Sequence, residues 1–311
     1  MIDILMAVFN GEKYVKKQIE SILAQDCSDW HLIIRDDGST DKSVQIICDI
    51  MKRYPDRITL ICAENSGSAK ANFFELIKLS ESEYAMFCDH DDFWLENKIS
   101  LTLKRMKQME KKYGAKTPLL VHTDLSVADK NLNKTAQSFF EFQGLDKRAR
   151  SLSRLLAQNN ITGCTVMINK ALRQLCVDTF PTELESGILM HDWWLGLLAS
   201  SCGKVGFVDK PTMLYRQHGN NELGAVNTKS PKYIIKCLKQ RKTSGRLNST
   251  YIQAAALYTA LKDTADSDAL DTIKKFVTIP AQNKFAKIHT IIKYDDKKQN
   301  FVSLLGQLIF C

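Results

Sequence analysis

Residues 83–94, EYAMFCDHDDFW, join an apolar run to a cluster of three carboxylates. The run from Tyr84 to Cys88 is typical of a buried β-strand. Asp89, Asp91 and Asp92 follow it directly, around a single histidine. Because like charges this close raise one another's pKa and repel, the pattern predicts a strand end at which a cation neutralises the cluster.

Similar apolar runs occur along the first 124 residues and alternate with segments of helical spacing. The runs are 2–8, 31–35, 58–63 and 118–123, and the helical segments are 12–25, 41–53, 69–80 and 96–112. This alternation predicts an α/β fold, with a mainly parallel central sheet flanked by helices on both faces. In such sheets ligands bind at the carboxyl ends of the strands, so the acidic loops after the strands are the expected site.

The second half of the chain is less regular, and the C-terminal part reads as helices alone. After a weak pattern at 125–160 we expect strands at 163–168, 204–208 and 212–216, with helices at 170–177 and 189–201. Further helices are expected at 230–241, 249–263, 267–277, 281–293 and 299–310. The sequence thus predicts a catalytic domain at 1–224, with halves 1–124 and 125–224, and an all-helical extension at 225–311.

Composition restricts the class of protein. With 311 residues, 44% hydrophobic and 25% charged, the chain is ordinary for a globular protein, which excludes a disordered one. Its nine cysteines are odd in number, scattered and without a CxxC pair, which predicts reduced thiols in the cytoplasm and no zinc site. We find no signal-peptide pattern and no run of the ~18 apolar residues that a membrane span needs.

The positive charge is concentrated in the C-terminal extension. Residues 225–311 carry 15 Lys and Arg against 6 Asp and Glu, and residues 229–246 carry seven Lys and Arg with no acid. Such a segment suits an anionic membrane surface, with the terminal FVSLLGQLIFC (301–311) dipping into it. The alternatives are a helical lid packed on the catalytic domain with a solvated basic face, or a contact between two copies. Nucleic-acid binding is disfavoured, because no recognised nucleic-acid motif accompanies the charge.

The three carboxylates after the fourth apolar run have unequal expected roles. In a strand, Asp89 and Asp91 point to the same side and His90 to the other, while Asp92 turns away at the strand end. Mg²⁺ or Mn²⁺ typically takes one or two carboxylates and lets substrate phosphates complete its coordination. The alternative is a solvated acidic turn.

Two other acidic motifs stand at the end of an expected strand or the start of an expected helix, where a carboxylate can contact a ligand. In RDDGSTD (35–41), Asp36 and Asp37 end the second strand, where a carboxylate can accept from a base N–H or a ribose hydroxyl. A plain strand-to-helix turn is the alternative. In HDWW (191–194), Asp192 begins a helix, a position that capping and the helix dipole favour without any catalytic role.

Six segments together carry a resemblance to a known family. They are ILMAVFNGEKYVKKQIESILAQ, LIIRDDGSTDKS, ENSGSAKANF, FCDHDDFWLENKI, HDWWLGLLAS and YRQHGNN. Over residues 1–224 the chain resembles family 2 glycosyltransferases of the GT-A fold, and its DHDDFW, HDWW and YRQHGNN segments are most similar to bacterial rhamnosyltransferases.

The resemblance implies roles on the donor side. Ala7 and Phe9 would border the nucleotide base, with Phe9 stacked on it, and Asp37 would accept from N3–H of uracil or thymine. The segment after the third strand would hold the anionic donor at free backbone N–H groups and a helix N-terminus. Its residues are Asn65, Gly67, Lys70 and Asn72, and for Lys70 a solvent-facing side chain is the alternative.

The resemblance also implies the metal ligands and the base. Asp91 would be the principal ligand of Mg²⁺ or Mn²⁺, Asp89 would touch ribose or the metal through water, and His218 would complete the coordination or be simply polar surface. Asp192 matches the general base of inverting members. Trp193 and Trp194 would line the acceptor pocket or pack in the core.

The implied reaction is inverting transfer of a sugar. The favoured donor is dTDP-β-L-rhamnose and the favoured acceptor is a lipid-linked polysaccharide, such as one carried on undecaprenyl diphosphate at the inner membrane face. UDP-galactose, UDP-glucose or a UDP-N-acetylhexosamine are alternative donors. A receiver-like regulatory protein or a non-catalytic nucleotide-binding protein is the alternative from another class.

Overall fold

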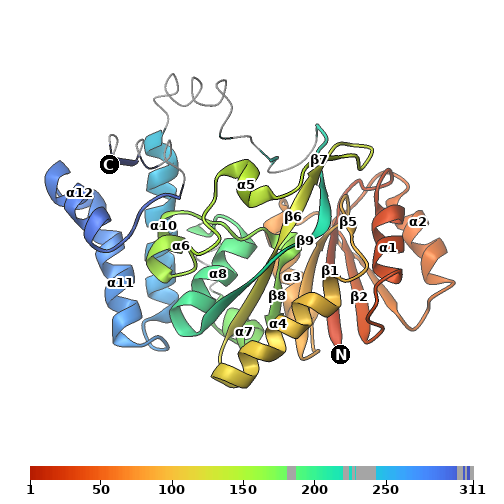
Figure 1. Ribbon diagram of the computed structural model, residues 1–311. Helices are drawn as coiled ribbons and strands as arrows, with labels where there is room; N and C mark the ends of the chain where they lie inside the picture. The colour runs from red at the N-terminus through yellow and green to blue at the C-terminus, as the bar shows by residue number, and fades with distance from the viewer. Residues whose placement is uncertain are drawn as a thin grey trace.

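The computed structural model describes residues 1–180, 187–219, 224–225, 228, 243–299, 304 and 307–308, without the side chains of 243–247. The first part of the chain alternates strands and helices as the sequence predicts (Figure 1). Its elements are β1 (Ile2–Val8), α1 (Val15–Leu23), β2 (Trp30–Asp36), α2 (Ser43–Met51), β3 (Ile58–Cys62), α3 (Ala69–Leu79), β4 (Tyr84–Asp89), β5 (Phe93–Trp94) and α4 (Lys98–Tyr113).

The second part completes the same sheet. Its elements are β6 (Leu119–Ala128), β7 (Lys134–Ala136), α5 (Phe139–Gln143), α6 (Leu152–Ala157), the 3-10 turn η1 (Gly163–Thr165), β8 (Met167–Asn169), α7 (Lys170–Thr179), α8 (His191–Cys202) and β9 (Lys204–Arg216). The strand order is β3-β2-β1-β4-β8-β6-β9-β5, with β7 added on β6.

Parallel pairing dominates the sheet, and short antiparallel pairings join its two halves. Strands β3, β2, β1 and β4 are parallel neighbours, and β6 runs parallel to β9 over most of its length. The antiparallel pairings of β8 with β4 and β6 involve three residue pairs or fewer. The expected α/β sheet is therefore present, with a mixed second half.

Three expected strands differ from the prediction. Residues 163–165 form the turn η1, so β8 begins only at Met167. The two pieces expected at 204–208 and 212–216 are one strand, β9, whose register shifts between Val208 and Pro211. Proline has no backbone N–H for the ladder, so a bulge at this point keeps the strand continuous although the sequence reads as a break.

Successive side chains along each strand pack alternately into two hydrophobic cores, one on each face of the sheet. On β1, Ile4 and Met6 face the core that contains α1, α2 and α4. Leu5 and Ala7 face the opposite core, which contains α3, α7 and α8. Because β3, β2, β1 and β4 are parallel, their carboxyl ends lie at one edge of the sheet, where the loops meet.

The C-terminal helices pack on the second core. They are α10 (Thr243–Leu261), α11 (Ser267–Thr278), the turn η3 (Ile279–Ala281) and α12 (Lys284–Lys293), at the end of the molecule remote from α1 and α2 (Figure 1). Leu257 and Ile273 are fully buried in the core that Leu155 of α6 shares. The expected helices at 230–241 and 299–310, and the basic segment 229–246, lie wholly or largely outside the described residues.

Neither a membrane span nor a disulfide occurs in the part of the chain that the structure describes. None of its helices is long and apolar enough to cross a bilayer. The seven cysteines that it includes are all free thiols.

Candidate active site

A cavity of about 330 Å³ lies at the carboxyl ends of β1, β2 and β4, between the first turn of α3 and the start of α8. It collects most of the residues that the sequence singled out. Those that line it are Ala7, Phe9, Asp37, Asn65, Gly67, Asn72, Asp89, Asp91 and Asp192. Candidates for nucleotide binding, metal binding and base catalysis thus share one enclosed space.

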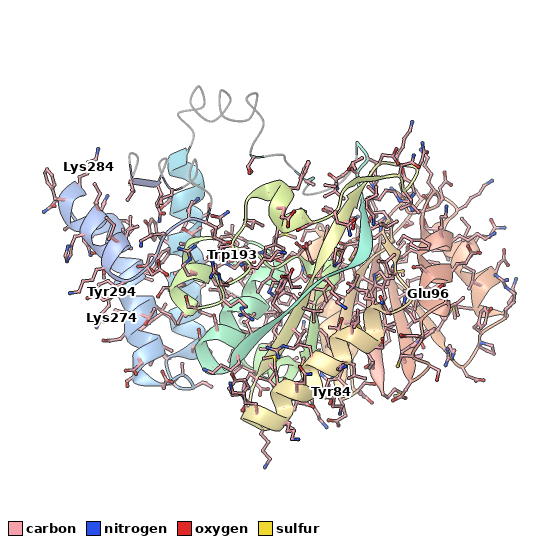
Figure 2. The ribbon with its side chains drawn as sticks, viewed as in Figure 1. Tyr84, Glu96, Trp193, Lys274, Lys284 and Tyr294 are labelled. Atoms are coloured by element: carbon pink, nitrogen blue, oxygen red, sulfur yellow. The ribbon has the colours of Figure 1, made fainter. Side chains whose placement is uncertain are left out.

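Four other candidates do not line this cavity. The ammonium of Lys70 donates to the carbonyl of Ile188, with 2.8 Å between the atoms, which ties α3 to the segment before α8. Trp194 is fully buried in the core. Trp193 is half-buried and donates from Nε1 to the carbonyl of Leu155 at 2.7 Å (Figure 2). The fourth, His218, contacts a lining residue instead.

Asp37 is held from two sides. Oδ1 accepts from the Arg35 guanidinium at 2.7 Å and from the backbone N–H of Ser66 at 2.9 Å, and Oδ2 accepts from the Ser66 hydroxyl at 2.9 Å. The same guanidinium donates to Oδ1 of Asn72 at 3.0 Å. Since a carboxylate offers about four acceptor positions, the buried Asp37 keeps capacity for one more donor.

The three carboxylates after β4 occupy different environments. Asp92 is fully buried, and its Oδ1 accepts from the backbone N–H of Arg216 at 3.0 Å. Burial, and then the charges of Asp91 and Asp89, raise the pKa of Asp92 well above its usual range. Asp91 and Asp89 line the cavity, whereas Asp92 is buried away from it, where its charged form is disfavoured.

His218 is paired with Asp91. Its Nε2 donates to Oδ2 of Asp91 at 2.7 Å, and both side chains are largely buried. The imidazole stacks on the ring of Tyr14 with 4.9 Å between centroids, and the Arg216 guanidinium lies 4.6 Å from the same ring. Tyr14 therefore holds the imidazole in place next to the carboxylate.

His90 differs from the expectation that it points away from its neighbours. It lines the cavity together with Asp89 and Asp91. A Cβ on Gly11 would lie 2.5 Å from the imidazole Cδ2. The chain turns at the end of β4, and the strand alternation assumed from the sequence no longer applies beyond Asp89.

The donor atoms around Asp91 fit a divalent cation. A carboxylate and an imidazole nitrogen 2.7 Å apart, with Asp89 in the same cavity, form an oxygen and nitrogen set that suits Mn²⁺ or Mg²⁺. Asp89, Asp92 and Cys164 also come within 4.8 Å of one another. Burial raises the pKa of the Cys164 thiol well above normal, so this second grouping is a poor ligand set.

Asp192 stands in the first turn of α8 and is 7% exposed. Its Oδ2 accepts from the backbone N–H of Gly163 at 2.9 Å, and its Oδ1 accepts from the side-chain amide of Asn159 at 3.2 Å. These donors and the positive end of the helix favour the ionised form and fix its direction. A carboxylate presented in this way in a cavity can accept a proton from a bound hydroxyl.

Other lining residues were not selected from the sequence. They are Val8, Ser68, Ala69, Phe73, His90, Thr162, Gly163, Met190, His191 and Tyr215. His191 and Tyr215 belong to the HDWW and YRQHGNN segments, so the motifs that carry the family resemblance already contained them. Arg35, which holds Asp37, also stood within a quoted motif, but no spacing pattern marks it.

An α/β sheet with an acidic cluster at its strand ends, and a fixed carboxylate lining the same cavity, has the arrangement of a glycosyltransferase of the GT-A fold. The chain belongs to glycosyltransferase family 2: the family model Glycosyl transferase family 2 matches residues 3–175.

Sequence relatives agree with this assignment. A Shigella flexneri protein named dTDP-rhamnosyl transferase RfbG is 30% identical over 237 residues, which span 73% of this chain and 76% of the relative. The uncharacterized protein Rv1520 of Mycobacterium tuberculosis is 25% identical over 228 residues, 72% of this chain and 61% of its own length.

Among solved structures, S. aureus TarS 1–349 in complex with UDP-GlcNAc has a TM-score of 0.52 at 17% identity, covering 95% of this chain and 88% of the other. This likeness bears on the fold alone. The predicted fold class, family and enzyme class are confirmed.

Proposed function

We propose that this chain transfers L-rhamnose from dTDP-β-L-rhamnose to a lipid-linked polysaccharide, with inversion at the anomeric carbon. The observation that carries the proposal is one cavity lined by Asp37, Asp91 and Asp192. Rhamnose as the sugar is supported by the 30% identity to a relative named a dTDP-rhamnosyl transferase.

Asp192 is the proposed general base. A sugar hydroxyl is a poor nucleophile, so its proton must be removed as the bond to the anomeric carbon forms. The Asp192 carboxylate lies in the cavity wall, held by Gly163 and Asn159, and is therefore aimed before the acceptor binds. With the base on one side of the sugar and the diphosphate leaving from the other, a single displacement inverts the configuration.

Asp91, with Asp89 and His218, is the proposed metal site. Bound Mg²⁺ or Mn²⁺ would supply positive charge that stabilises the departing diphosphate. Asp91 and His218 are already fixed by contact with each other and with the Tyr14 ring. Asp92 is buried beside them, and burial together with the charges of Asp91 and Asp89 disfavours its ionised form.

Asp37 and Phe9 are the proposed nucleotide contacts. Thymine and uracil carry an N3–H that can donate a hydrogen bond to a carboxylate, whereas cytosine N3 is itself a hydrogen-bond acceptor. Phe9 is 47% exposed although it lines the cavity, which suits an aromatic ring that a base covers on binding.

The outer face of α12 is the proposed membrane contact. Phe285 is 88% exposed and Ile292 is 53% exposed, and the helix carries Lys284, Lys287 and Lys293 with no acid. Lys284 stands at the outer edge of the helical end of the molecule (Figure 2). A second copy is the less favourable partner, because an isologous contact would bring these lysines together. An anionic lipid surface complements both the charge and the apolar side chains.

The donor is tested by nucleotide release from a panel of sugar nucleotides. The purified protein with Mn²⁺ and a lipid-linked saccharide acceptor is incubated with dTDP-β-L-rhamnose, UDP-galactose, UDP-glucose or UDP-N-acetylglucosamine, and the freed nucleotide is measured. We expect dTDP-rhamnose to give the fastest release. Faster release from a UDP sugar would identify the alternative donor, and no release from any donor would favour a non-catalytic protein.

A further inference from the structure

His191 is a buried polar residue whose ring has no hydrogen-bond partner among the described residues. It opens α8, is 3% exposed and lines the cavity beside Asp192. Neither ring nitrogen has a hydrogen-bond partner within the described part of the chain. Because a buried polar group left unpaired costs about 1–3 kcal/mol, this arrangement calls for a partner that the protein itself does not provide.

The position of the imidazole is fixed by packing. The ring stacks on Phe73 with 4.1 Å between centroids and an interplanar angle of 29°, and it lies 5.6 Å from Phe87. Phe73 belongs to α3 and Phe87 to β4, two elements of the donor side of the site. With a face covered by an aromatic ring, the imidazole can hydrogen-bond only in its own plane, through its nitrogens.

Gly163 packs against one of these nitrogens. A Cβ added at Gly163 would lie 2.6 Å from Nε2 of His191, closer than packing allows. Gly163 also lines the cavity, and its N–H is bonded to Asp192. The glycine therefore lets the ring edge that carries Nε2 approach a backbone segment of the cavity lining, where any other residue would block it.

The charge state selects the class of ligand. Burial lowers the pKa of His191 to about 3, so the ring is neutral at physiological pH. A neutral imidazole has one hydrogen-bond donor and one acceptor, which can pair with the donor and acceptor of a hydroxyl. It has no positive charge that would attract a phosphate. A sugar hydroxyl fits this pair better than the diphosphate.

We infer that His191 is a specificity-determining residue that hydrogen-bonds a hydroxyl of the sugar being transferred. The inference rests on the proposed function. It assigns recognition of the donor sugar to His191, which contacts Phe73 and precedes the proposed base Asp192. Sites built to hydrogen-bond a hydroxyl discriminate strongly against analogues that lack it.

The test compares His191→Phe with wild type on dTDP-β-L-rhamnose and on analogues deoxygenated at C2, C3 or C4. The variant keeps an aromatic ring on Phe73 but loses both nitrogens. We expect the kcat/KM of the variant for the full sugar to fall about tenfold to hundredfold below that of wild type. For the one analogue that lacks the recognised hydroxyl, the variant and wild type should have equal kcat/KM, because neither can make the contact. Binding of dTDP with Mn²⁺ should stay within about twofold of wild type.

His122 provides the matched control. It too is fully buried with both nitrogens unpaired and a pKa near 3, but it packs against Phe140 and Phe207 and does not line the cavity. His122→Phe should leave the ratio of rates between full and deoxy sugars unchanged.

Three results would overturn the inference: an equal loss on every analogue, no loss on the full sugar, or a loss of dTDP binding in His191→Phe. Failure of the proposed donor is recognised separately, because wild type would then not turn over dTDP-rhamnose. The same comparison would next be run with the deoxy series of the sugar that wild type does use.

Discussion

At the scale of single residues, Asp37 is the proposed contact between the second strand and the nucleotide base. Its carboxylate is buried and shared between Arg35 and Ser66, so the side chain has a fixed direction before any ligand arrives. The local sequence shows that an acidic residue ends the strand. It does not show that an arginine two residues earlier holds it.

Asp37→Asn should change which pyrimidine binds. The amide can turn an N–H toward the base, which opposes the N3–H of thymine but suits the N3 acceptor of cytosine. We expect the affinity for dTDP to fall about tenfold or more, while the affinity for CDP stays level or rises. Calorimetric titration with each nucleotide in Mn²⁺ measures this, and an equal loss for both nucleotides would contradict the role.

Asp91→Asn should weaken metal binding. The substitution removes the charge of the central ligand but keeps its shape, so the Mn²⁺ concentration for half-maximal activity should rise about tenfold to hundredfold. His218→Gln should shift it in the same direction. Asp49→Asn on α2, an exposed carboxylate paired with Lys52, is the control and should have no effect. An unchanged Mn²⁺ requirement in Asp91→Asn would place the metal elsewhere.

At the scale of elements, hydrophobic periodicity predicted where most strands and helices lie, but not where a strand begins or whether two strand-like runs form one strand. Apolar runs of four to eight residues cannot distinguish a strand from a 3-10 turn, which is why Gly163–Thr165 read as strand. This turn matters for function, because its first residue bonds Asp192 and borders His191. That contact joins residues 29 positions apart, which local pattern alone does not predict.

The α12 face should govern binding to membranes. Phe285→Glu with Ile292→Glu removes two exposed apolar side chains and adds negative charge, so binding to vesicles that contain phosphatidylglycerol should fall about tenfold or more. Leu79→Glu, at the end of α3 and 44% exposed, is the control. Cosedimentation with these vesicles and with neutral phosphatidylcholine vesicles measures the effect. Equal binding by the double variant and wild type would rule out this face.

At the scale of the whole molecule, the sequence predicted the class of fold and about half of the residues that line the cavity. It did so because parallel strands bring their carboxyl ends to one edge, so distant motifs converge without further information. It left open whether the C-terminal helices pack on the catalytic part, since amphipathic helices do not reveal what covers their apolar face, and the structure shows that α10 and α11 share a core with that part. The division of the chain near residue 225 stays a prediction.

In the proposed mechanism one cavity holds two separate functions: proton removal at Asp192, and donor and metal binding at Asp37 and Asp91. The most direct measurement is the rate of dTDP release from dTDP-rhamnose by Asp192→Asn in the presence of a lipid-linked saccharide acceptor, with dTDP affinity measured on the same preparation. We predict a rate at least about a hundredfold below wild type, with affinity within about twofold. A rate near that of wild type, or a parallel loss of affinity, would contradict the claim.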